Sequence, residues 1–264
     1  MKYWSYDPFC AKMKVVDILA AFLPFDRHLA MSAGDALPDR ARGAALFADI
    51  SGFTALTATL RHELGARRGA EEVIAHIDSL YATLIEQVHN YRGSIIGFSG
   101  DAVTCWFDES AGGAPDAVER AATCAFELQA VMATRPAIVT PAGASIPLAI
   151  KGAVAAGPAR RFLVGGPDTY VIEVLAGATL DRMAAAEGLA RRGEVVVAPE
   201  VAARLGRTAP VLEWREAAGD AYAVLGSLTN RVSPSPPPEP PPREPDAAPR
   251  GLLPQRKYWF VIGT

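Results

Sequence analysis

Apolar residues recur every three or four positions between Glu71 and Tyr91, and this is the most regular pattern in the chain. The repeat consists of Val73, Ile77, Leu80, Leu84 and Val88. This spacing places the apolar side chains on one face of a helix, which is then buried against the rest of the protein. The pattern predicts an amphipathic helix that Gly93 ends.

Short apolar runs on both sides of this helix predict β-strands. The run Gly43–Asp49 ends in an acid, and Ser51–Thr54 follows it as a turn that can start a helix. After the helix, the runs Ser94–Phe98 and Ala102–Phe107 flank Ser99–Asp101. This composition is typical of a β-hairpin with an acid at its tip.

The remaining apolar patterns alternate between helix and strand. We expect, in chain order, a helix at 115–132, strands at 146–154 and 161–164, a helix at 171–187, a strand at 194–198, a short helix at 199–205 and a strand at 221–225. This order is typical of an α+β protein in which helices cover one face of a mostly antiparallel sheet.

Proline marks the clearest boundary in the chain. Nine of the seventeen residues in 233–249 are proline, which predicts a stiff, extended linker. The tail 250–264 is too short to fold alone. We therefore expect one domain at 38–232, preceded in 1–37 by an amphipathic helix and a lead-in segment.

Composition excludes several classes of function. The chain has 264 residues and a net charge of −3, with no basic stripe, which argues against nucleic-acid binding. No apolar stretch reaches the roughly 18 to 20 residues of a membrane span. The three cysteines lack metal-site spacing and are expected to be reduced, which favours a cytoplasmic protein.

Two acids stand at chemically useful places, Asp49 at the end of the first strand and Asp101 at the hairpin tip. If the hairpin pairs beside that strand, both carboxylates reach one edge of the sheet. Such a pair repels unless a cation lies between its members, and its oxygen ligands suit Mg²⁺ or Mn²⁺ completed by phosphates. Gly52 permits close approach of a phosphate, and the amides of Ser51–Thr54 can meet the anion.

Three arginine pairs are interpreted as solvated loop charges. They are Arg67–Arg68, Arg160–Arg161 and Arg191–Arg192. Contact between one of them and a triphosphate or an anionic regulator is the alternative.

Two segments resemble the signature segments of class III nucleotidyl cyclases. They are Leu46–Leu56, with the sequence LFADISGFTAL, and Arg92–Ala102, with the sequence RGSIIGFSGDA. Their acids are 52 positions apart, with one long helix between them, which is also the family's spacing. The resemblance covers about Leu23 to Leu225 and looks closest to the amino-terminal domain of soluble adenylyl cyclases.

The resemblance implies a ferredoxin-like βαββαβ cyclase sandwich and a composite active site in a dimer. Asp49 and Asp101 would bind two Mg²⁺ or Mn²⁺ ions, with the carbonyl of Ile50 completing one shell. The amides of Ser51, Gly52, Phe53 and Thr54 would hold the β- and γ-phosphates. The implied reaction is attack of the ribose 3′-oxygen of ATP, or GTP, on the α-phosphorus, which releases pyrophosphate and a 3′,5′-cyclic nucleotide.

The sequence also departs from the family pattern. A lysine that helps to recognise the purine is usual four residues before the second acid, and this chain has Gly97 there. The predicted helix at 171–187 contains no Asn, and Arg182 does not match the register of the transition-state arginine. One interpretation is the metal-donating half of an enzyme completed by a second cyclase domain or, less well, by a homodimer. The alternative is a non-catalytic regulatory or dimerisation module.

Overall fold

The computed structural model describes residues 24–236, apart from 112 and 166–170. The first 23 residues, most of the Pro-rich linker and the tail lie outside the described residues. The elements are α2 (Phe25–Ser32), β1 (Arg40–Ser51), α3 (Phe53–Asn90), β2 (Ser94–Ser99), β3 (Ala102–Asp108), α4 (Ala117–Thr134), β4 (Ile138–Val139), β5 (Ser145–Ile146), β6 (Ala149–Gly165), β7 (Val171–Ala176), α5 (Ala178–Leu189), β8 (Val195–Val197), α6 (Pro199–Leu205), the 3₁₀ turn η2 (Gly206–Thr208), β9 (Val211–Ala217) and β10 (Asp220–Leu225).

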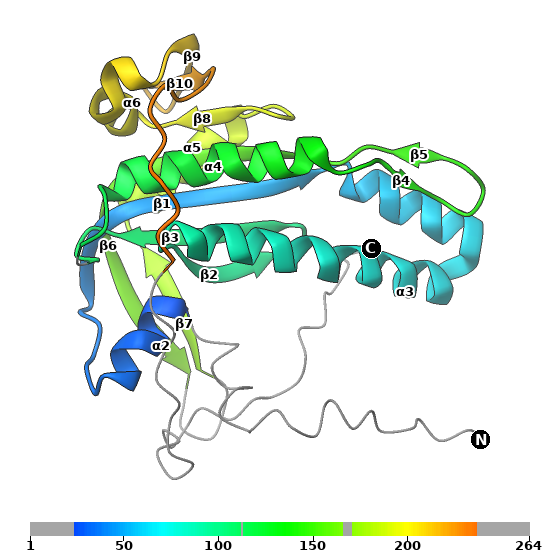
Figure 1. Ribbon diagram of the computed structural model, residues 1–264, viewed down its shortest axis with the longest axis horizontal. Helices are drawn as coiled ribbons and strands as arrows, with labels where there is room; N and C mark the ends of the chain where they lie inside the picture. The colour runs from blue at the N-terminus through cyan, green and yellow to red at the C-terminus, as the bar shows by residue number, and fades with distance from the viewer. Residues whose placement is uncertain (1–23, 112, 166–170, 237–264) are drawn as a thin grey trace.

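The main sheet has eight strands, in the order β2-β3-β1-β6-β8-β10-β9, with β7 paired to one end of β6. All its pairs are antiparallel except β6 with β8. The series β1, α3, β2, β3, α4, β6 has the βαββαβ connectivity expected from the sequence (Figure 1). The α+β class and the mostly antiparallel sheet are therefore confirmed.

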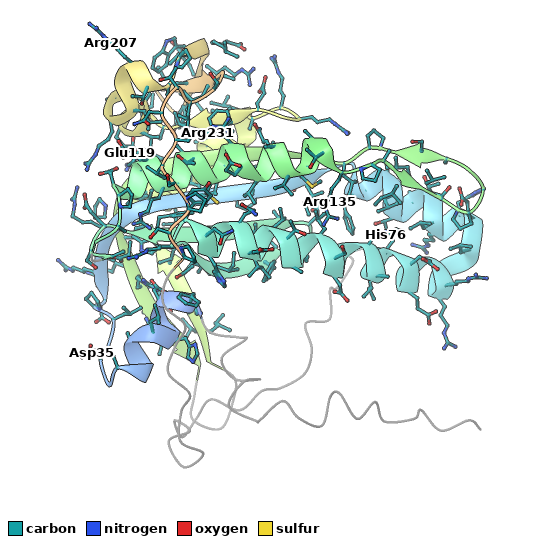
Figure 2. All side chains as sticks on the ribbon, in the orientation of Figure 1. Asp35, His76, Glu119, Arg135, Arg207 and Arg231 are labelled. Atoms are coloured by element: carbon teal, nitrogen blue, oxygen red, sulfur yellow. The ribbon has the colours of Figure 1, made fainter. Side chains whose placement is uncertain are left out.

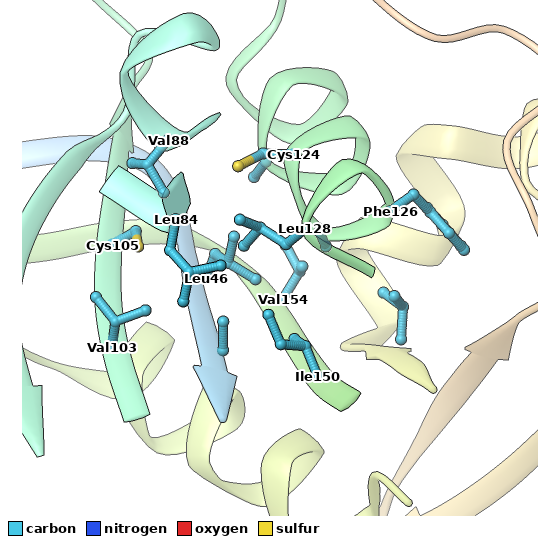
Figure 3. Close-up of a cluster of buried hydrophobic side chains, with 14 of the residues drawn as sticks. Leu46, Leu84, Val88, Val103, Cys105, Cys124, Phe126, Leu128, Ile150 and Val154 are labelled. Atoms are coloured by element: carbon cyan, nitrogen blue, oxygen red, sulfur yellow. The ribbon is translucent and has the colours of Figure 1, made fainter. Parts of the chain in front are cut away.

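Alternating strand residues build a core on each face of the sheet. On one face, side chains of α3, α4 and α6 pack on residues such as Leu46, Cys105 and Val154 (Figure 3). On the other face, α5 contributes Met183 and Ala186 to a smaller cluster. The sequence predicted helices on one face only, and this is partly wrong, because α5 packs its apolar side chains on the second face.

Helix α3 is a hairpin of two helical arms. Gly65 has φ 80° and ψ 171°, which interrupts the helix. At Gly69 a Cβ would lie 2.7 Å from the carbonyl oxygen of Leu60, so glycine allows the arms to approach closely. The amphipathic helix predicted for 71–91 is the second arm, and the first arm starts directly after β1.

The helix predicted for 171–187 is partly wrong. Residues Val171–Ala176 form β7, which pairs with β6, and α5 begins only at Ala178. The β-branched Val171, Ile172 and Val174 favour a strand, and Gly177 at φ 126° separates strand from helix. The segment predicted as a separate strand at 161–164 is the end of β6, which runs for 17 residues.

Strand β9 was not predicted. It forms a hairpin with β10 across Ala218 and Gly219, whose φ angles are 51° and 88°. Two positive φ angles are typical of a tight hairpin turn, so Gly219 was the residue from which this turn could have been predicted. The strand carries Glu213, Arg215 and Glu216, and its polarity concealed it.

The segment after β10 crosses the helical face towards the end of α3. Arg231, which Figure 2 labels, donates a hydrogen bond from Nη1 to Glu127 on α4 at 2.6 Å, and the amide of Ser235 donates to the carbonyl of Asn90 at 2.8 Å. The Pro-rich linker therefore begins beside the carboxyl end of α3. None of the helices in the described part of the chain is long and apolar enough to cross a membrane.

Candidate metal and phosphate site

Asp49 and Asp101 lie at the same rim of the sheet. Asp49 is near the end of β1, where it stands opposite Ala102, the residue after Asp101. The amide of Ile50 donates to the carbonyl of Asp101 at 3.3 Å. Strand pairing thus brings together two acids that are 52 positions apart in the sequence.

A lysine that sequence reasoning missed stands beside Asp49. Lys151 occupies the opposite position on β6, and its Nζ lies 3.3 Å from Asp49 Oδ2 and 2.6 Å from Glu187 Oε1. Burial lowers the pKa of Lys151, but hydrogen bonds to Glu187 and Asp49 outweigh this and raise it overall. The sequence feature that could have drawn attention to Lys151 is its charge within the otherwise apolar run 149–156.

The two carboxylates act on each other electrostatically. Burial raises the pKa of Asp101, and the negative charge of Asp49 raises it further. Burial, Asp101 and Asp49 together raise the pKa of Tyr81 to about 12. The rim therefore carries concentrated negative charge, which a divalent cation would neutralise.

The turn after β1 leaves backbone amides open. Gly52 precedes α3 with φ 101°, and a Cβ there would lie 2.8 Å from the carbonyl oxygen of Pro147. Because glycine has no side chain, it gives the first turn no side-chain cap. The amides of Phe53 and Thr54 have no partner within the helix, as at any helix start, and can donate hydrogen bonds to an anion there.

One member of each of two arginine pairs makes contacts that the sequence did not predict. Arg192 Nη2 donates to the carbonyl of Pro147 at 2.6 Å, and its Nη1 would lie 3.6 Å from a Cβ at Gly52. It is exposed but stands beside the candidate phosphate turn. Arg161 is only 1% exposed and is ion-paired with Glu173, so its assignment as a solvated charge was wrong.

The donor set fits a metal ion that arrives with a nucleotide. Within the residues the structure describes, no group of three or more His, Cys, Asp or Glu side chains could hold a metal. Asp49 and Asp101 supply oxygen ligands only, which Mg²⁺ and Mn²⁺ prefer, and Mg²⁺ commonly takes one or two carboxylates plus substrate phosphates. Lys151 already places a positive charge beside Asp49.

Two further positions from the sequence analysis are Gly97 and Arg182. Gly97 is on β2, and an added Cβ would meet no atom within 4 Å. Arg182 Nε lies 3.1 Å from Glu200 Oε1, and its Nη2 donates to the carbonyl of Ala156. Ala156 is five residues along β6 from Lys151, or roughly 17 Å. Arg182 therefore takes no part in the rim of Asp49 within one chain.

The fold is similar to that of solved adenylyl and guanylyl cyclase domains. The guanylyl cyclase Cya2 has a TM-score of 0.61 and 19% identity, covering 75% of this chain and 98% of that one. The adenylyl cyclase CyaB from P. aeruginosa has a TM-score of 0.56 and 20% identity, covering 71% and 95%. The guanylate cyclase domain of RhGC from Catenaria anguillulae, solved with GTP, has a TM-score of 0.59 and 17% identity, covering 72% and 99%.

Among individual proteins, the sequence is similar to adenylate cyclase type 10. The rabbit protein (Oryctolagus cuniculus) is 26% identical over 157 residues, or 60% of this chain, and the mouse protein (Mus musculus) is 25% identical over 171 residues, or 63%. The matched region is 9% of the rabbit protein and 10% of the mouse protein. No model of a known protein family matches the sequence.

Proposed function

We propose that this chain is a class III adenylate cyclase-like domain that takes part in converting ATP to 3′,5′-cyclic AMP and pyrophosphate for signalling. The observation that carries the proposal is the meeting of Asp49 and Asp101 at one rim, beside the Gly52 turn. The cyclase fold and the similarity to adenylate cyclase type 10 support it. The cytoplasmic location remains a prediction.

In this proposal the carboxylates of Asp49 and Asp101 and the carbonyl of Ile50 hold two divalent ions, Mg²⁺ or Mn²⁺. Bound there, such ions lower the pKa of the ribose 3′-hydroxyl and neutralise charge on the α-phosphate and the leaving pyrophosphate. The amides of Ser51–Thr54 bind the β- and γ-phosphates.

Two cationic side chains extend the proposed phosphate site. Lys151 Nζ stands between Asp49 and Glu187, so it can balance the charge of the rim and contact a phosphate oxygen. Arg192 stands beside the Gly52 turn from the other side. Both groups stabilise the negative charge of a triphosphate electrostatically, which is the main contribution that a protein makes to phosphoryl transfer.

The proposed active site is completed by a second cyclase domain or a second copy of this chain. Gly97 cannot read a purine, and Arg182 is held by Glu200. The choice between ATP and GTP therefore rests with the partner.

The hairpin of β6 and β7 supports association, because it exposes Phe162, Leu163, Val164 and Ile172 by 39%, 48%, 45% and 48%. Phe162, Val164 and Ile172 lie on one face of the hairpin, because Ile172 pairs with Val164 and alternate strand residues share a face. Exposed apolar groups that lie together in this way mark an interaction surface.

A non-catalytic regulatory or dimerisation module is the second candidate. The same glycine at position 97 and the engagement of Arg182 by Glu200 favour it. It predicts association without turnover, with or without bound nucleotide.

The test measures binding and turnover separately. The full chain is titrated with Mn²⁺ and a non-hydrolysable ATP analogue, and cyclic AMP is measured with Mn²⁺ and ATP, alone and with candidate partner domains. We expect Asp49→Asn and Asp101→Asn each to weaken Mn²⁺–nucleotide binding at least tenfold and to abolish cyclic AMP formation. Asp78→Asn, which removes an exposed carboxylate of α3, is the matched control. Equal Mn²⁺ binding by all variants would refute the metal site, and binding without turnover with any partner would favour the regulatory module.

A further inference from the structure

The turn that carries Asp101 is held from two sides. On one side, the amide of Ile50 on β1 donates to the carbonyl of Asp101 at 3.3 Å. On the other, the hydroxyl of Tyr81 on α3 donates to the carbonyl of Gly100 at 2.8 Å. Gly100 has φ 63°, and an added Cβ would meet no atom within 4 Å. The position of Asp101 is set by these hydrogen bonds together with the pairing of Ala102 with Ser99 on β2 and with Asp49 on β1.

Tyr81 is itself firmly placed. It is 7% exposed within the core between α3 and the sheet, and its ring meets Phe98 edge-on at 4.9 Å between centroids. A tyrosine hydroxyl is protonated near neutral pH, so it remains a donor. The hydroxyl therefore connects helix α3 to the tip of the β2–β3 hairpin, beyond the last strand pair.

The turn also needs holding, because the carboxylates of Asp49 and Asp101 repel each other before a metal ion binds, and the ion pair of Lys151 with Asp49 offsets only part of this repulsion. Repulsion favours arrangements in which the Asp101 turn moves away from β1. A metal ion that needs both carboxylates would then have to bring the turn back, which lowers its apparent affinity.

We propose that Tyr81 is a positioning residue for the metal site: its hydroxyl holds the Gly100–Asp101 turn so that the Asp101 carboxylate stays beside Asp49 in the metal-free protein. This inference rests on the proposed function. Tyr81 acts through the turn and does not touch the reacting atoms. Loss of the Tyr81 hydroxyl raises the metal concentration needed for half-saturation and leaves the rate at saturating metal nearly unchanged.

Tyr81→Phe tests this directly, because it removes one hydroxyl and retains the ring against Phe98. A neutral hydrogen bond is worth about 0.5–1.5 kcal/mol, which is a factor of about 2 to 13. We expect the half-saturating Mn²⁺ concentration of the full chain to rise about five- to tenfold, and amide hydrogen exchange at residues 100–102 to become faster. Any turnover at saturating Mn²⁺ should change less than twofold.

Tyr91→Phe is the matched control, since it also removes a buried tyrosine hydroxyl, at 4% exposure, but lies near Glu127 and Arg231. It should leave Mn²⁺ binding and exchange at residues 100–102 unchanged. The positioning role is refuted if Tyr81→Phe matches the parent chain both in amide exchange at residues 100–102 and in Mn²⁺ binding. It is also refuted if amide exchange becomes faster while Mn²⁺ binding stays unchanged. If the parent chain binds no Mn²⁺ through Asp49, the proposed function fails. Independently of Mn²⁺, unchanged amide exchange at residues 100–102 in Tyr81→Phe would refute the role of Tyr81 in holding the turn.

Discussion

At the residue scale, the Gly52 turn admits only glycine. Its φ of 101° is unfavourable for other residues, and a Cβ would collide with the carbonyl oxygen of Pro147 at 2.8 Å. We expect Gly52→Ala to lower the free energy of unfolding by about 1–3 kcal/mol and to raise the KM for nucleotide. Denaturant unfolding and initial rates measure these effects.

Gly34→Ala separates the strain of a positive φ from the collision. Gly34 has φ 80°, but nothing lies within 4 Å of an added Cβ. Gly34→Ala should lower the free energy of unfolding less than Gly52→Ala does and leave the KM for nucleotide unaltered. Equal losses in both variants would contradict a special role for the Gly52 turn.

Gly97 can be replaced without steric cost, because its surroundings on β2 are open. Glycine in a strand costs about 0.5–1 kcal/mol relative to other residues, so Gly97→Lys should be neutral or slightly stabilising. With a partner domain present, we expect the added ammonium group to lower the KM for ATP. Thermal unfolding and initial rates measure this, and a stability loss above about 1 kcal/mol would show that the position is not open.

The pH dependence of the metal-free protein follows from Asp101. Its pKa is raised in the folded state by burial and by Asp49, so the folded chain binds this proton more tightly than the unfolded chain does. The resulting stability is present below the unfolded pKa and is lost as pH rises through the folded pKa. Asp101→Asn should remove this loss, which denaturant unfolding at several pH values will measure. A parent and variant with parallel pH profiles would contradict the raised pKa.

At the element scale, a buried ion cluster attaches α2 to the hairpin of β6 and β7. Arg161 Nε donates to Glu173 Oε1 at 2.6 Å, its Nη2 donates to Asp26 Oδ1 at 3.1 Å, and Arg27 also pairs with Glu173. Arg27, Arg161 and Glu173 are each at most 8% exposed. Removing one member leaves an uncompensated buried charge.

We therefore expect Glu173→Gln to destabilise the protein by about 3–5 kcal/mol, measured by denaturant unfolding. Glu71→Gln is the control, because its ion pair with Arg67 is exposed by 63% and 93% and should contribute little. Similar losses in both variants would mean that the buried cluster holds α2 no more firmly than a surface pair would.

Local patterns made some elements predictable and others not. The second arm of α3 and the β2–β3 hairpin follow from short-range periodicity and turn residues, so the sequence predicted both. Strand β7 was hidden because only Gly177 divides it from α5. The pairing of Asp49 with Lys151 depends on the register of β1 against β6, about 100 positions apart, and no local pattern encodes that register.

At the scale of the whole molecule, the rim of Asp49 and Asp101 and the side chain of Arg182 lie apart along the sheet. In the proposed function a second cyclase domain or a second copy of this chain completes the site, and we propose the exposed hairpin of β6 and β7 as the contact surface. We expect the full chain to self-associate, and Phe162→Asp to weaken this association at least tenfold in sedimentation velocity. Leu212→Asp on β9, where the side chain is 73% exposed, is the control. Equal association of all three proteins would exclude the hairpin as the interface.

The most direct test is a crystal structure of the full chain with Mn²⁺ and a non-hydrolysable ATP analogue, with anomalous scattering used to locate manganese. The account predicts manganese peaks bridging the carboxylates of Asp49 and Asp101, with the triphosphate against the amides of Ser51–Thr54. A bound nucleotide with no manganese at these two carboxylates, and Lys151 still paired with Asp49, would contradict it.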